Sequence, residues 1–416
     1  MKTTIINIAK AAKHAASILA TTSNANKNQA LQAMATALRQ QTAEILIANH
    51  LDFSAAQTAR KSPAFLDRLV LDDKRIAAMA QGLEAIMALD DPVGKILHHI
   101  TRPNGLDIAR ISVPLGVIGI IYESRPNVTA DAAGLALKAG NATILRCGSE
   151  SFHSATAILK ALHLGLAQAN LPKESIQLIP TIDRAAVEVL LTLDEYIDVL
   201  IPRGGPALIQ YIVANSRIPL FKHLAGLCHT YIHKAADLSM ARKVLLNAKM
   251  RRTGICGATE VLLIDREIVA THLPALIADL KTAHCEIRGE PDVAALDPDI
   301  RLANADDYDT EYLDAIISVK IVDNLSAALA HIAQHSTKHT DAIITNDKNA
   351  ADIFLQNVDS AIVMHNTSTQ FADGGEFGMG AEIGISTGKL HARGPVGVAQ
   401  LTIFKYIVRG NGQIRQ

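Results

Sequence analysis

The chain has 416 residues, enough for two or three domains with a large buried core. Its 40 lysines and arginines balance its 41 aspartates and glutamates, so no strong field attracts nucleic acid or an anionic membrane surface. Hydrophobic residues make up 49% of the chain and aromatic residues only 4%, which argues against disorder and is typical of helix-covered sheets.

The chain contains four cysteines: Cys147, Cys228, Cys256 and Cys285. They lie too far apart for a zinc ribbon or a Cys-x-x-Cys redox pair, so we expect no metal site. Basic residues interrupt the N-terminal segment 1–17, and no uncharged run reaches the length of about 18 residues that a membrane helix needs. We therefore expect a cytoplasmic protein with free thiols and no membrane association.

The segment 1–95 is rich in Ala and is predicted to be helical. Leu31, Met34, Ala35 and Leu38 recur at the spacing i, i+3, i+4 and i+7, which places them on one face of a helix. The fold is therefore expected to begin with a series of helices.

Short apolar runs alternate with helical stretches in the next part of the chain. These runs cover residues 116–122, 142–147, 176–180 and 198–204. Their length and alternation predict β-α-β units in a parallel sheet. The helix after the first run has Asn127 or Thr129 as its N-cap and Gly140 as its stop.

A second α/β series begins near Arg251. Its predicted strands cover residues 257–265, 316–323, 341–347 and 360–365, and a helical stretch covers 273–283. This alternation predicts a second domain with a parallel sheet.

Two further segments are predicted to form exposed strands. The segment 100–114 contains Pro-Asn-Gly between β-prone stretches, which predicts a projecting hairpin, and residues 401–408 form an apolar C-terminal run. Such strands pair either with another subunit or within the chain. We expect a homo-oligomer, with internal pairing as the alternative.

No strand is followed by the Gly-x-Gly-x-x-Gly dinucleotide motif or by a Walker lysine loop. Gly204 and Gly205 do stand between a predicted strand and a predicted helix, where their amides could face a pyrophosphate. The alternative interpretation is an ordinary strand-to-helix turn.

The segment 251–260 places Cys256 between Gly254 and Gly257, next to two arginines and just before a predicted strand. Nearby cations favour the thiolate, which is the form that attacks an acyl carbon. The alternative is a small buried cysteine without a reactive role. The flanking glycines and arginines favour a nucleophile, whereas the other three cysteines lie in or beside strand-like runs and are expected to be structural.

The segment 371–395 is unusually rich in glycine. Glycine lets a backbone approach a ligand closely, but it also serves irregular connections that need positive φ angles. Both interpretations stay open.

Taken together, these segments resemble the gamma-glutamyl phosphate reductases of the aldehyde dehydrogenase superfamily. The resemblance rests on the blocks at residues 114–146 (PLGVIGIIYESRPNVTADAAGLALKAGNATILR), 201–205 (IPRGG), 223–238 (HLAGLCHTYIHKAADL), 247–260 (NAKMRRTGICGATE), 311–323 (EYLDAIISVKIVD), 339–347 (HTDAIITND) and 371–395 (FADGGEFGMGAEIGISTGKLHARGP).

This resemblance implies an α/β, aldehyde dehydrogenase-like fold with a Rossmann-type nucleotide-binding domain, an α/β catalytic domain and an oligomerisation hairpin. The NADP(H)-binding domain is expected at residues 1–96 and 111–249, and the catalytic domain at 250–390. The hairpin and C-terminal strand are expected at 97–110 and 391–416.

The resemblance also implies an oxidoreductase that uses NADPH to reduce L-glutamyl 5-phosphate to L-glutamate 5-semialdehyde with release of phosphate, the second step of proline biosynthesis from glutamate. An association with glutamate 5-kinase is also expected. Two alternatives are another reductase of the superfamily that acts on a different acyl donor, such as an acyl-CoA, and a catalytically silent scaffold.

The resemblance also implies which residues are catalytic, by matching positions of this sequence to those of the family. Cys256 occupies the position of the superfamily nucleophile, and its backbone amide with the side chain of Asn127, or with Ser124, is expected to hold the oxyanion. His223 stands where hydrolytic relatives carry the glutamate that activates water. His223 is expected to act as a proton donor or base, or merely to bond the backbone.

Binding residues are also implied by the resemblance. Arg146 with Ser149, in place of an acid, favours the 2′-phosphate of NADP. The cofactor-binding residues are expected to be Tyr122, Glu123, Ser124, Arg146, Ser149, Gly204, Gly205 and Glu311. The charged groups of the substrate are expected to meet Arg125, Arg252, Asp373 and Glu376.

Overall fold

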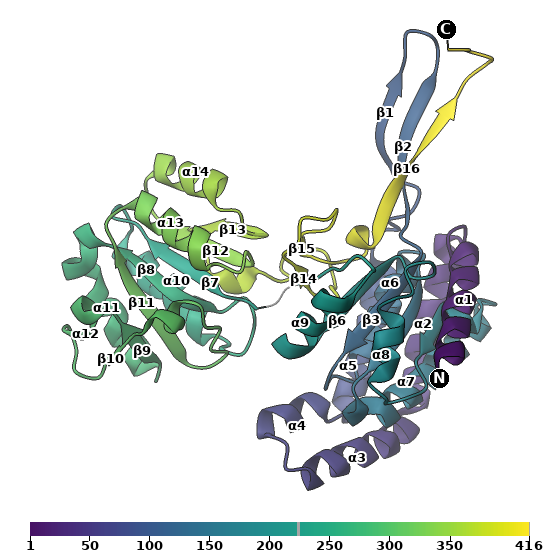
Figure 1. The fold of residues 1–416 in the computed structure, drawn as a ribbon, viewed down its shortest axis with the longest axis horizontal. Helices are drawn as coiled ribbons and strands as arrows, with labels where there is room; N and C mark the ends of the chain where they lie inside the picture. Colours follow the sequence, from purple (N-terminus) through teal and green to yellow (C-terminus); the bar gives the residue numbers. More distant parts are fainter. Residues whose placement is uncertain (223–224, 416) are drawn as a thin grey trace.

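The structure is a computed structural model that describes residues 1–222 and 225–415. Within these residues, the strands form a four-stranded, a seven-stranded and a three-stranded sheet, and one short two-stranded pair. Figure 1 shows the first two sheets in separate layered bodies, with the three-stranded sheet projecting from one of them as a narrow arm. The two-stranded pair, β14 (Ile385–Ser386) and β15 (Gly394–Pro395), lies between the bodies.

The predicted helical entry is confirmed. The helices before the first strand are α1 (Lys2–Leu19), α2 (Asn24–Gln40), α3 (Thr42–Thr58), α4 (Pro63–Leu69) and α5 (Asp73–Ala88). On α2, the side chains of Leu31, Met34, Ala35 and Leu38 are buried together, as their spacing predicted. This helix packs against α5 and against α7 (Phe152–Gln168), so the entry helices cover the four-stranded sheet.

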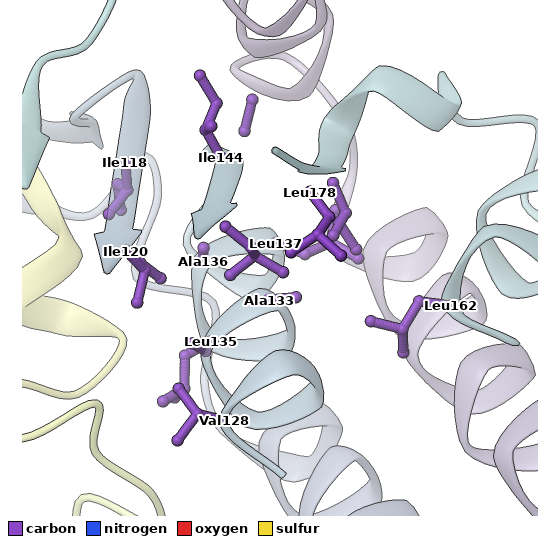
Figure 2. Close-up of a cluster of buried hydrophobic side chains, with 14 of the residues drawn as sticks. Ile118, Ile120, Val128, Ala133, Leu135, Ala136, Leu137, Ile144, Leu162 and Leu178 are labelled. Carbon is purple, nitrogen blue, oxygen red and sulfur yellow. The ribbon is translucent and has the colours of Figure 1, made fainter. Parts of the chain in front are cut away.

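The four-stranded sheet is parallel throughout, with the order β5-β4-β3-β6. Its strands are β3 (Val117–Tyr122), β4 (Ala142–Cys147), β5 (Ile176–Leu178) and β6 (Val199–Arg203), and its connecting helices, besides α7, are α6 (Val128–Lys138), α8 (Ala185–Leu190) and α9 (Pro206–Asn215). Every residue of β3 and β4 is buried, which is why these strands are continuously apolar rather than alternating. Figure 2 shows Ala136 and Leu137 of α6 near Ile144 and Leu178 of this sheet, while Leu135 lies with Val128 on another side of the helix. The predicted boundaries of α6 are confirmed, with Asn127 as N-cap and Gly140 after its end at φ 78°.

The seven-stranded sheet has the order β10-β9-β11-β8-β7-β12-β13 and is also parallel. Its strands are β7 (Cys228–Ile232), β8 (Thr259–Asp265), β9 (Glu286–Gly289), β10 (Arg301–Leu302), β11 (Ile316–Val322), β12 (Thr340–Ile344) and β13 (Ile362–His365). Its helices are α10 (Leu238–Met250), α11 (Val269–Thr282), α12 (Pro291–Ala294), α13 (Leu325–His335) and α14 (Lys348–Asn357).

One predicted domain boundary differs from the observed arrangement of the strands. Residues 228–249 were expected in the nucleotide-binding domain, yet β7 pairs with both β8 and β12 near the middle of the seven-stranded sheet. The strand is fully buried there, so its pairing partners rather than its neighbours in sequence decide where it lies.

The projecting arm consists of β1 (Ile96–Thr101), β2 (Asp107–Pro114) and β16 (Thr402–Arg409). The predicted hairpin is confirmed, because β1 and β2 are antiparallel neighbours. The strand β16 pairs with β2 from Thr402 to Arg409, so the C-terminal run finds an internal partner. All six residues of β1 are exposed in the single chain. Assembly into an oligomer stays a prediction.

Among the described helices, none combines the length and the apolar character needed to cross a membrane.

Candidate active site

Cys256 lies in the loop between α10 and β8. Its side chain is half-buried. The backbone of Gly226 presses against it, because a Cβ at Gly226 would lie 2.1 Å from the carbonyl oxygen of Cys256 and 2.5 Å from its Cα. From below, the thiol of Cys228 donates a hydrogen bond to the same carbonyl oxygen at 3.1 Å. Cys256 is therefore held by its backbone while its thiol stays partly accessible.

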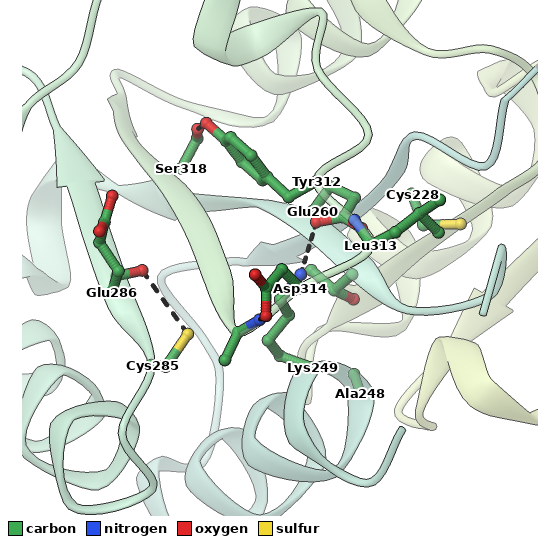
Figure 3. A network of polar contacts seen from close by, with 12 residues as sticks. Cys228, Ala248, Lys249, Glu260, Cys285, Glu286, Tyr312, Leu313, Asp314 and Ser318 are labelled. Carbon is green, nitrogen blue, oxygen red and sulfur yellow. Dashed lines mark hydrogen bonds and ion pairs between the residues drawn. The ribbon is translucent and has the colours of Figure 1, made fainter. Parts of the chain in front are cut away.

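A buried ion pair closes the two ends of the Cys256 loop. Lys249, in the last turn of α10, bonds Glu260, in β8, and both side chains are 0% exposed. Glu260 also accepts a hydrogen bond from the backbone N–H of Leu313 at 3.3 Å. Figure 3 shows these residues grouped with Tyr312 in one polar network. The loop is thereby fixed at the two points where it leaves regular structure.

Gln370 fixes the loop from the opposite side. Its side-chain amide donates to the carbonyl oxygens of Ala248 at 2.9 Å and Arg252 at 3.2 Å, and its oxygen accepts from Arg251 at 3.3 Å. Gln370 is itself buried. The chain that follows β13 therefore helps to shape the loop that carries Cys256.

The resting form of Cys256 differs from the expectation. Burial raises the pKa of its thiol to about 11, with Glu311 and Glu382 adding to the rise and Arg203 opposing it. The expected preference for the thiolate is thus outweighed by desolvation in the ligand-free chain. Attack by this sulfur requires that its proton leave as the substrate binds.

Arginines from both bodies gather around Cys256. Burial lowers the pKa of Arg125, and repulsion from Arg203, Arg68 and Arg252 lowers it further, whereas the Cys256 thiolate would raise it. Arg125 follows β3, Arg203 ends β6, and Arg252 precedes Cys256 in its loop. The guanidinium groups of Arg125, Arg203 and Arg252 have neither an ion pair nor a hydrogen bond to any residue in the described ranges.

The end of β3 and the segment after it carry several of the predicted residues. Tyr122 is buried, and its hydroxyl group lies 2.7 Å from that of Thr129. Ser124 has a left-handed backbone, with φ 51°, and both its N–H and its hydroxyl donate to Glu150. A strained residue held in this way directs the chain that follows it.

Asn127, the expected oxyanion donor, is engaged within α6. Its side-chain Nδ2 donates to Asp131 at 2.8 Å, and burial raises the pKa of Asp131 to about 6. A primary amide carries two N–H groups, so one remains for another acceptor.

The predicted pyrophosphate turn already holds a carboxylate. The N–H of Gly205, at the start of α9, donates to Glu123 at 3.0 Å. Glu123 belongs to the predicted cofactor residues and lies on the neighbouring strand end, since its own N–H donates to the carbonyl of Arg203 at 3.0 Å. The amide is thus well placed for an anion, and an anionic side chain occupies it.

Arg146 and Ser149 lie at the carboxyl end of β4. The guanidinium of Arg146 donates to the carbonyls of Cys147 at 2.7 Å and Ile182 at 3.2 Å. Its buried Nε has no hydrogen-bond partner in the described part of the chain. Ser149 is exposed beside it.

Glu311 lies near Cys256. Burial raises the pKa of Glu311, while a hydrogen bond from the Gly226 N–H and the charge of Lys249 oppose the rise.

The glycine-rich segment contributes acidic groups to the same region. Asp373 accepts hydrogen bonds from the N–H groups of Gly375 at 2.8 Å and Glu376 at 3.3 Å, and Glu376 is exposed. Glu382 accepts from Gly374 at 3.0 Å, and burial followed by the charge of Asp373 raises its pKa.

His223 lies outside the described residues, so its predicted role stays untested. In the described ranges there is no cluster of three or more His, Cys, Asp or Glu side chains suited to a metal ion.

Comparison with known proteins gives the family. The aldehyde dehydrogenase family model matches residues 2–308. The gamma-glutamyl phosphate reductase of Paramagnetospirillum magneticum is 60% identical over 409 residues, which cover 98% of this chain and 97% of that protein. The chain belongs to the gamma-glutamyl phosphate reductases of the aldehyde dehydrogenase family. It is thus an oxidoreductase of this family, and the predicted family and fold class are confirmed.

Solved structures agree. The gamma-glutamyl phosphate reductase of Thermotoga maritima has a TM-score of 0.97 at 41% identity, covering 99% of this chain and 100% of its own. An engineered glycolyl-CoA reductase with bound NADP+ has a TM-score of 0.67 at 14% identity, covering 97% of this chain and 96% of its own. At this identity, the similarity to the glycolyl-CoA reductase shows only that the two proteins share a fold.

The sequence analysis missed four charged residues of this region: Arg203, Lys249, Glu260 and Glu382. For Glu260 a readable signal existed, because a carboxylate inside a predicted buried strand needs a partner. The others become visible only through contacts between segments that are distant in sequence.

Proposed function

We propose that the enzyme uses NADPH to reduce L-glutamyl 5-phosphate to L-glutamate 5-semialdehyde and releases phosphate, a step of proline biosynthesis. The observation that carries this proposal is the 60% identity to a gamma-glutamyl phosphate reductase over 98% of the chain. The position of Cys256 supports it, because a half-buried thiol near arginines that have no ion pair among the described residues suits an anionic acyl donor.

We assign nucleotide binding to the body built on the four-stranded sheet. Ligands of open parallel sheets bind at the carboxyl ends of the strands, where Glu123, Arg146, Ser149 and Gly205 lie. The buried Nε of Arg146, unpartnered among the described residues, and the neutral Ser149 fit a 2′-phosphate better than a ribose hydroxyl. When bound, NADPH supplies the hydride for the reduction.

Glu311 is proposed to meet the ribose that carries the nicotinamide. Its carboxylate is held by the N–H of Gly226, on the segment that also packs against Cys256. A ribose there would lie beside the reacting carbon.

Cys256 is proposed as the nucleophile. Its sulfur forms a bond to the γ-acyl carbon, the bond from that carbon to the phosphate oxygen breaks, and the thiol proton leaves with the phosphate. The resulting thioester accepts a hydride at its carbonyl carbon, and the carbon–sulfur bond then breaks to give the aldehyde, with the thiol reprotonated. His223, outside the described residues, keeps its proposed part in these proton transfers.

The oxyanion of each tetrahedral state is proposed to accept the backbone N–H of Cys256 and the free N–H of Asn127. Asp131 orients the Asn127 amide through its 2.8 Å bond, which leaves the second N–H of the amide for the oxyanion. Donors fixed in advance in this way are worth about 10² to 10³ in rate.

The remaining groups of the substrate are proposed to meet the other predicted residues. L-Glutamyl 5-phosphate carries two anionic groups and one ammonium group. Arg125 and Arg252 supply cations for the anionic groups, and Asp373 with Glu376 supplies carboxylates for the ammonium group.

The reverse reaction tests the proposal. Glutamate semialdehyde and NADP are incubated with and without inorganic phosphate, and NADPH formation is followed by its absorbance. We expect activity that requires phosphate and disappears in Cys256→Ala, while Cys228→Ala retains it because that thiol is buried beneath the loop. Activity with coenzyme A in place of phosphate, or without either, would refute the proposed substrate.

A further inference from the structure

Arg203 is a charged residue at the active site to which no role has yet been given. We propose that Arg203, flanked by Arg125 and Arg252, binds the phosphoryl group of the substrate and holds it as it leaves the acyl carbon. This inference rests on the proposed function and adds to it the residue that recognises the leaving group.

The backbone fixes Arg203 at the edge where the two bodies face each other. Arg203 is the last residue of β6 and is paired in register with Tyr122 at the end of β3. The N–H of Glu123 donates to its carbonyl oxygen at 3.0 Å, so Arg125 emerges from the adjacent strand end two residues later. Two cations from one sheet edge are thus directed to the same place.

The side chain of Arg203 extends from this edge to the segment between the bodies. Its guanidinium packs against Gly384, where an added Cβ would lie 2.4 Å from Nη1 and 3.0 Å from Cζ. Glycine at this position leaves room for the guanidinium to cross. The third arginine, Arg252, comes from the other body in the loop of Cys256.

The guanidinium groups of this cluster have no ion pair within residues 1–222 and 225–415. Arg203 is half-buried, and its guanidinium has no hydrogen bond or ion pair with the residues that the structure describes. Glu382 is the nearby carboxylate that feels its charge, but Glu382 is bonded to the N–H of Gly374. Arginines that repel one another favour an anion between them, and a phosphate dianion satisfies several guanidinium groups at once.

The chemistry of the substrate decides which anion belongs to Arg203. In an acyl phosphate, the phosphate oxygen is bonded directly to the carbon that Cys256 attacks, whereas the α-carboxylate lies four carbon–carbon bonds away. The guanidinium of Arg203 lies against Gly384, between the bodies, and its charge lowers the pKa of the Cys256 thiol. We therefore assign the leaving group to Arg203 and the α-carboxylate to the other arginines.

A phosphate could also come from the pyrophosphate of the nucleotide. That source is disfavoured because the N–H of Gly205, at the start of α9, donates to Glu123, whereas the guanidinium of Arg203 lies against Gly384. The two sources predict different kinetics, so one set of experiments separates them.

The first experiment compares Arg203→Gln and Arg203→Lys with wild type in the reverse reaction, varying phosphate, semialdehyde and NADP in turn. Loss of a hydrogen bond to a charged group costs about tenfold or more in affinity. We expect the KM for phosphate to rise at least about tenfold in Arg203→Gln, less in Arg203→Lys, and the KM values for NADP and semialdehyde to change less than about threefold. Arg217→Gln, an exposed arginine just after α9, is the matched control and should leave all three unchanged.

The second experiment does not depend on turnover. Alkylation of Cys256 by iodoacetamide is followed by peptide mass spectrometry with and without inorganic phosphate, in the absence of nucleotide. We expect phosphate to slow alkylation in wild type and in Arg217→Gln, and to have no effect in Arg203→Gln.

The outcomes are distinct. A raised KM for NADP with an unchanged KM for phosphate would assign Arg203 to the nucleotide and overturn the inference. Unchanged kinetics and retained phosphate protection in Arg203→Gln would overturn it as well. Wild-type activity that does not need phosphate would instead refute the proposed function. If Arg203→Gln fails to fold, Arg203→Lys carries both tests, because it keeps the charge and loses the paired geometry of the guanidinium.

Discussion

Replacing Lys249 by methionine tests whether the buried ion pair holds the Cys256 loop. Methionine has nearly the volume of the lysine stem but no charge, so Glu260 would be left with no cation in a site where both partners are 0% exposed. Burial already raises the pKa of Glu260 above its ordinary value of 4.5, with Lys249 opposing the rise, so removal of Lys249 raises it further.

The magnitude follows from this burial. Removing one partner of a buried ion pair costs about 3–5 kcal/mol. For a chain of 416 residues, at about 2.1 cal/mol/K of unfolding entropy per residue, that corresponds to a fall of roughly 3–6 °C in the midpoint of thermal unfolding. Because the pKa of Glu260 is raised in the folded state, its stabilising effect is present below pH 4.5 and is lost as the pH rises. The penalty in Lys249→Met is therefore expected to be larger at pH 8 than at pH 5.

Thermal unfolding is followed by circular dichroism, since the chain has no Trp. Lys234→Met is the control, because Lys234 pairs with Glu267 at 2.9 Å on the surface, with side chains 50% and 63% exposed. Such exposed pairs contribute less than about 1 kcal/mol. The double variant Lys249→Met/Glu260→Gln, which keeps an acceptor for Leu313, is expected to recover most of the loss. The reasoning fails if Lys249→Met matches Lys234→Met, or if the double variant is no more stable than Lys249→Met.

Two further predictions concern the same body. Gly226→Ala is expected to displace Cys256 and to lower kcat at least about tenfold, because its Cβ would meet the Cys256 backbone at 2.1–2.5 Å, whereas Gly254→Ala, whose Cβ would lie 3.7 Å from the nearest described atom, should keep its activity. Equal activities would show that the contact is irrelevant to catalysis. Burial, followed by the charges of His229, His335 and Lys320, lowers the pKa of His331 to about 3 from 6.5, so the native state binds fewer protons than the unfolded chain between these values. Stability is expected to fall as the pH drops below 6.5, by about 2 kcal/mol at pH 5 through this group. His331→Phe should flatten the dependence of the thermal midpoint on pH between 7 and 4.5, and an unchanged slope would contradict the assignment.

Local patterns predicted most of the fold because its strands are buried on both faces. The apolar runs around Ile118, Ile144 and Leu262 are too short for helices and are separated by helical spacing, so each could be placed from its own residues. The strand β7 was misplaced for a physical reason. Its partners β8 and β12 are distant in sequence, and a fully buried strand has the same composition in either sheet.

The site was predictable to the extent that its chemistry is local. The glycines and arginines around Cys256 were the basis of the hypothesis that this residue is the nucleophile. The raised pKa of its thiol could not be predicted, because it depends on burial by segments that fold onto it. Arg203 was overlooked because it ends an apolar run, and the two glycines that follow it were interpreted as a pyrophosphate turn. Its role depends on Gly384 and Arg252, which lie more than 45 residues away in sequence.

The hydrogen bond from the Gly205 N–H to the Glu123 carboxylate means that a nucleotide bound at the proposed site would have to exchange with this carboxylate. Without ligand, the positive end of α9 is already neutralised by a tethered anion, so an incoming pyrophosphate would replace one acceptor with another. The measured affinity would then report the difference between two anions at one amide. Displacement of the Glu123 carboxylate would also shift the adjoining residues Ser124 and Arg125, and Arg125 interacts electrostatically with Cys256.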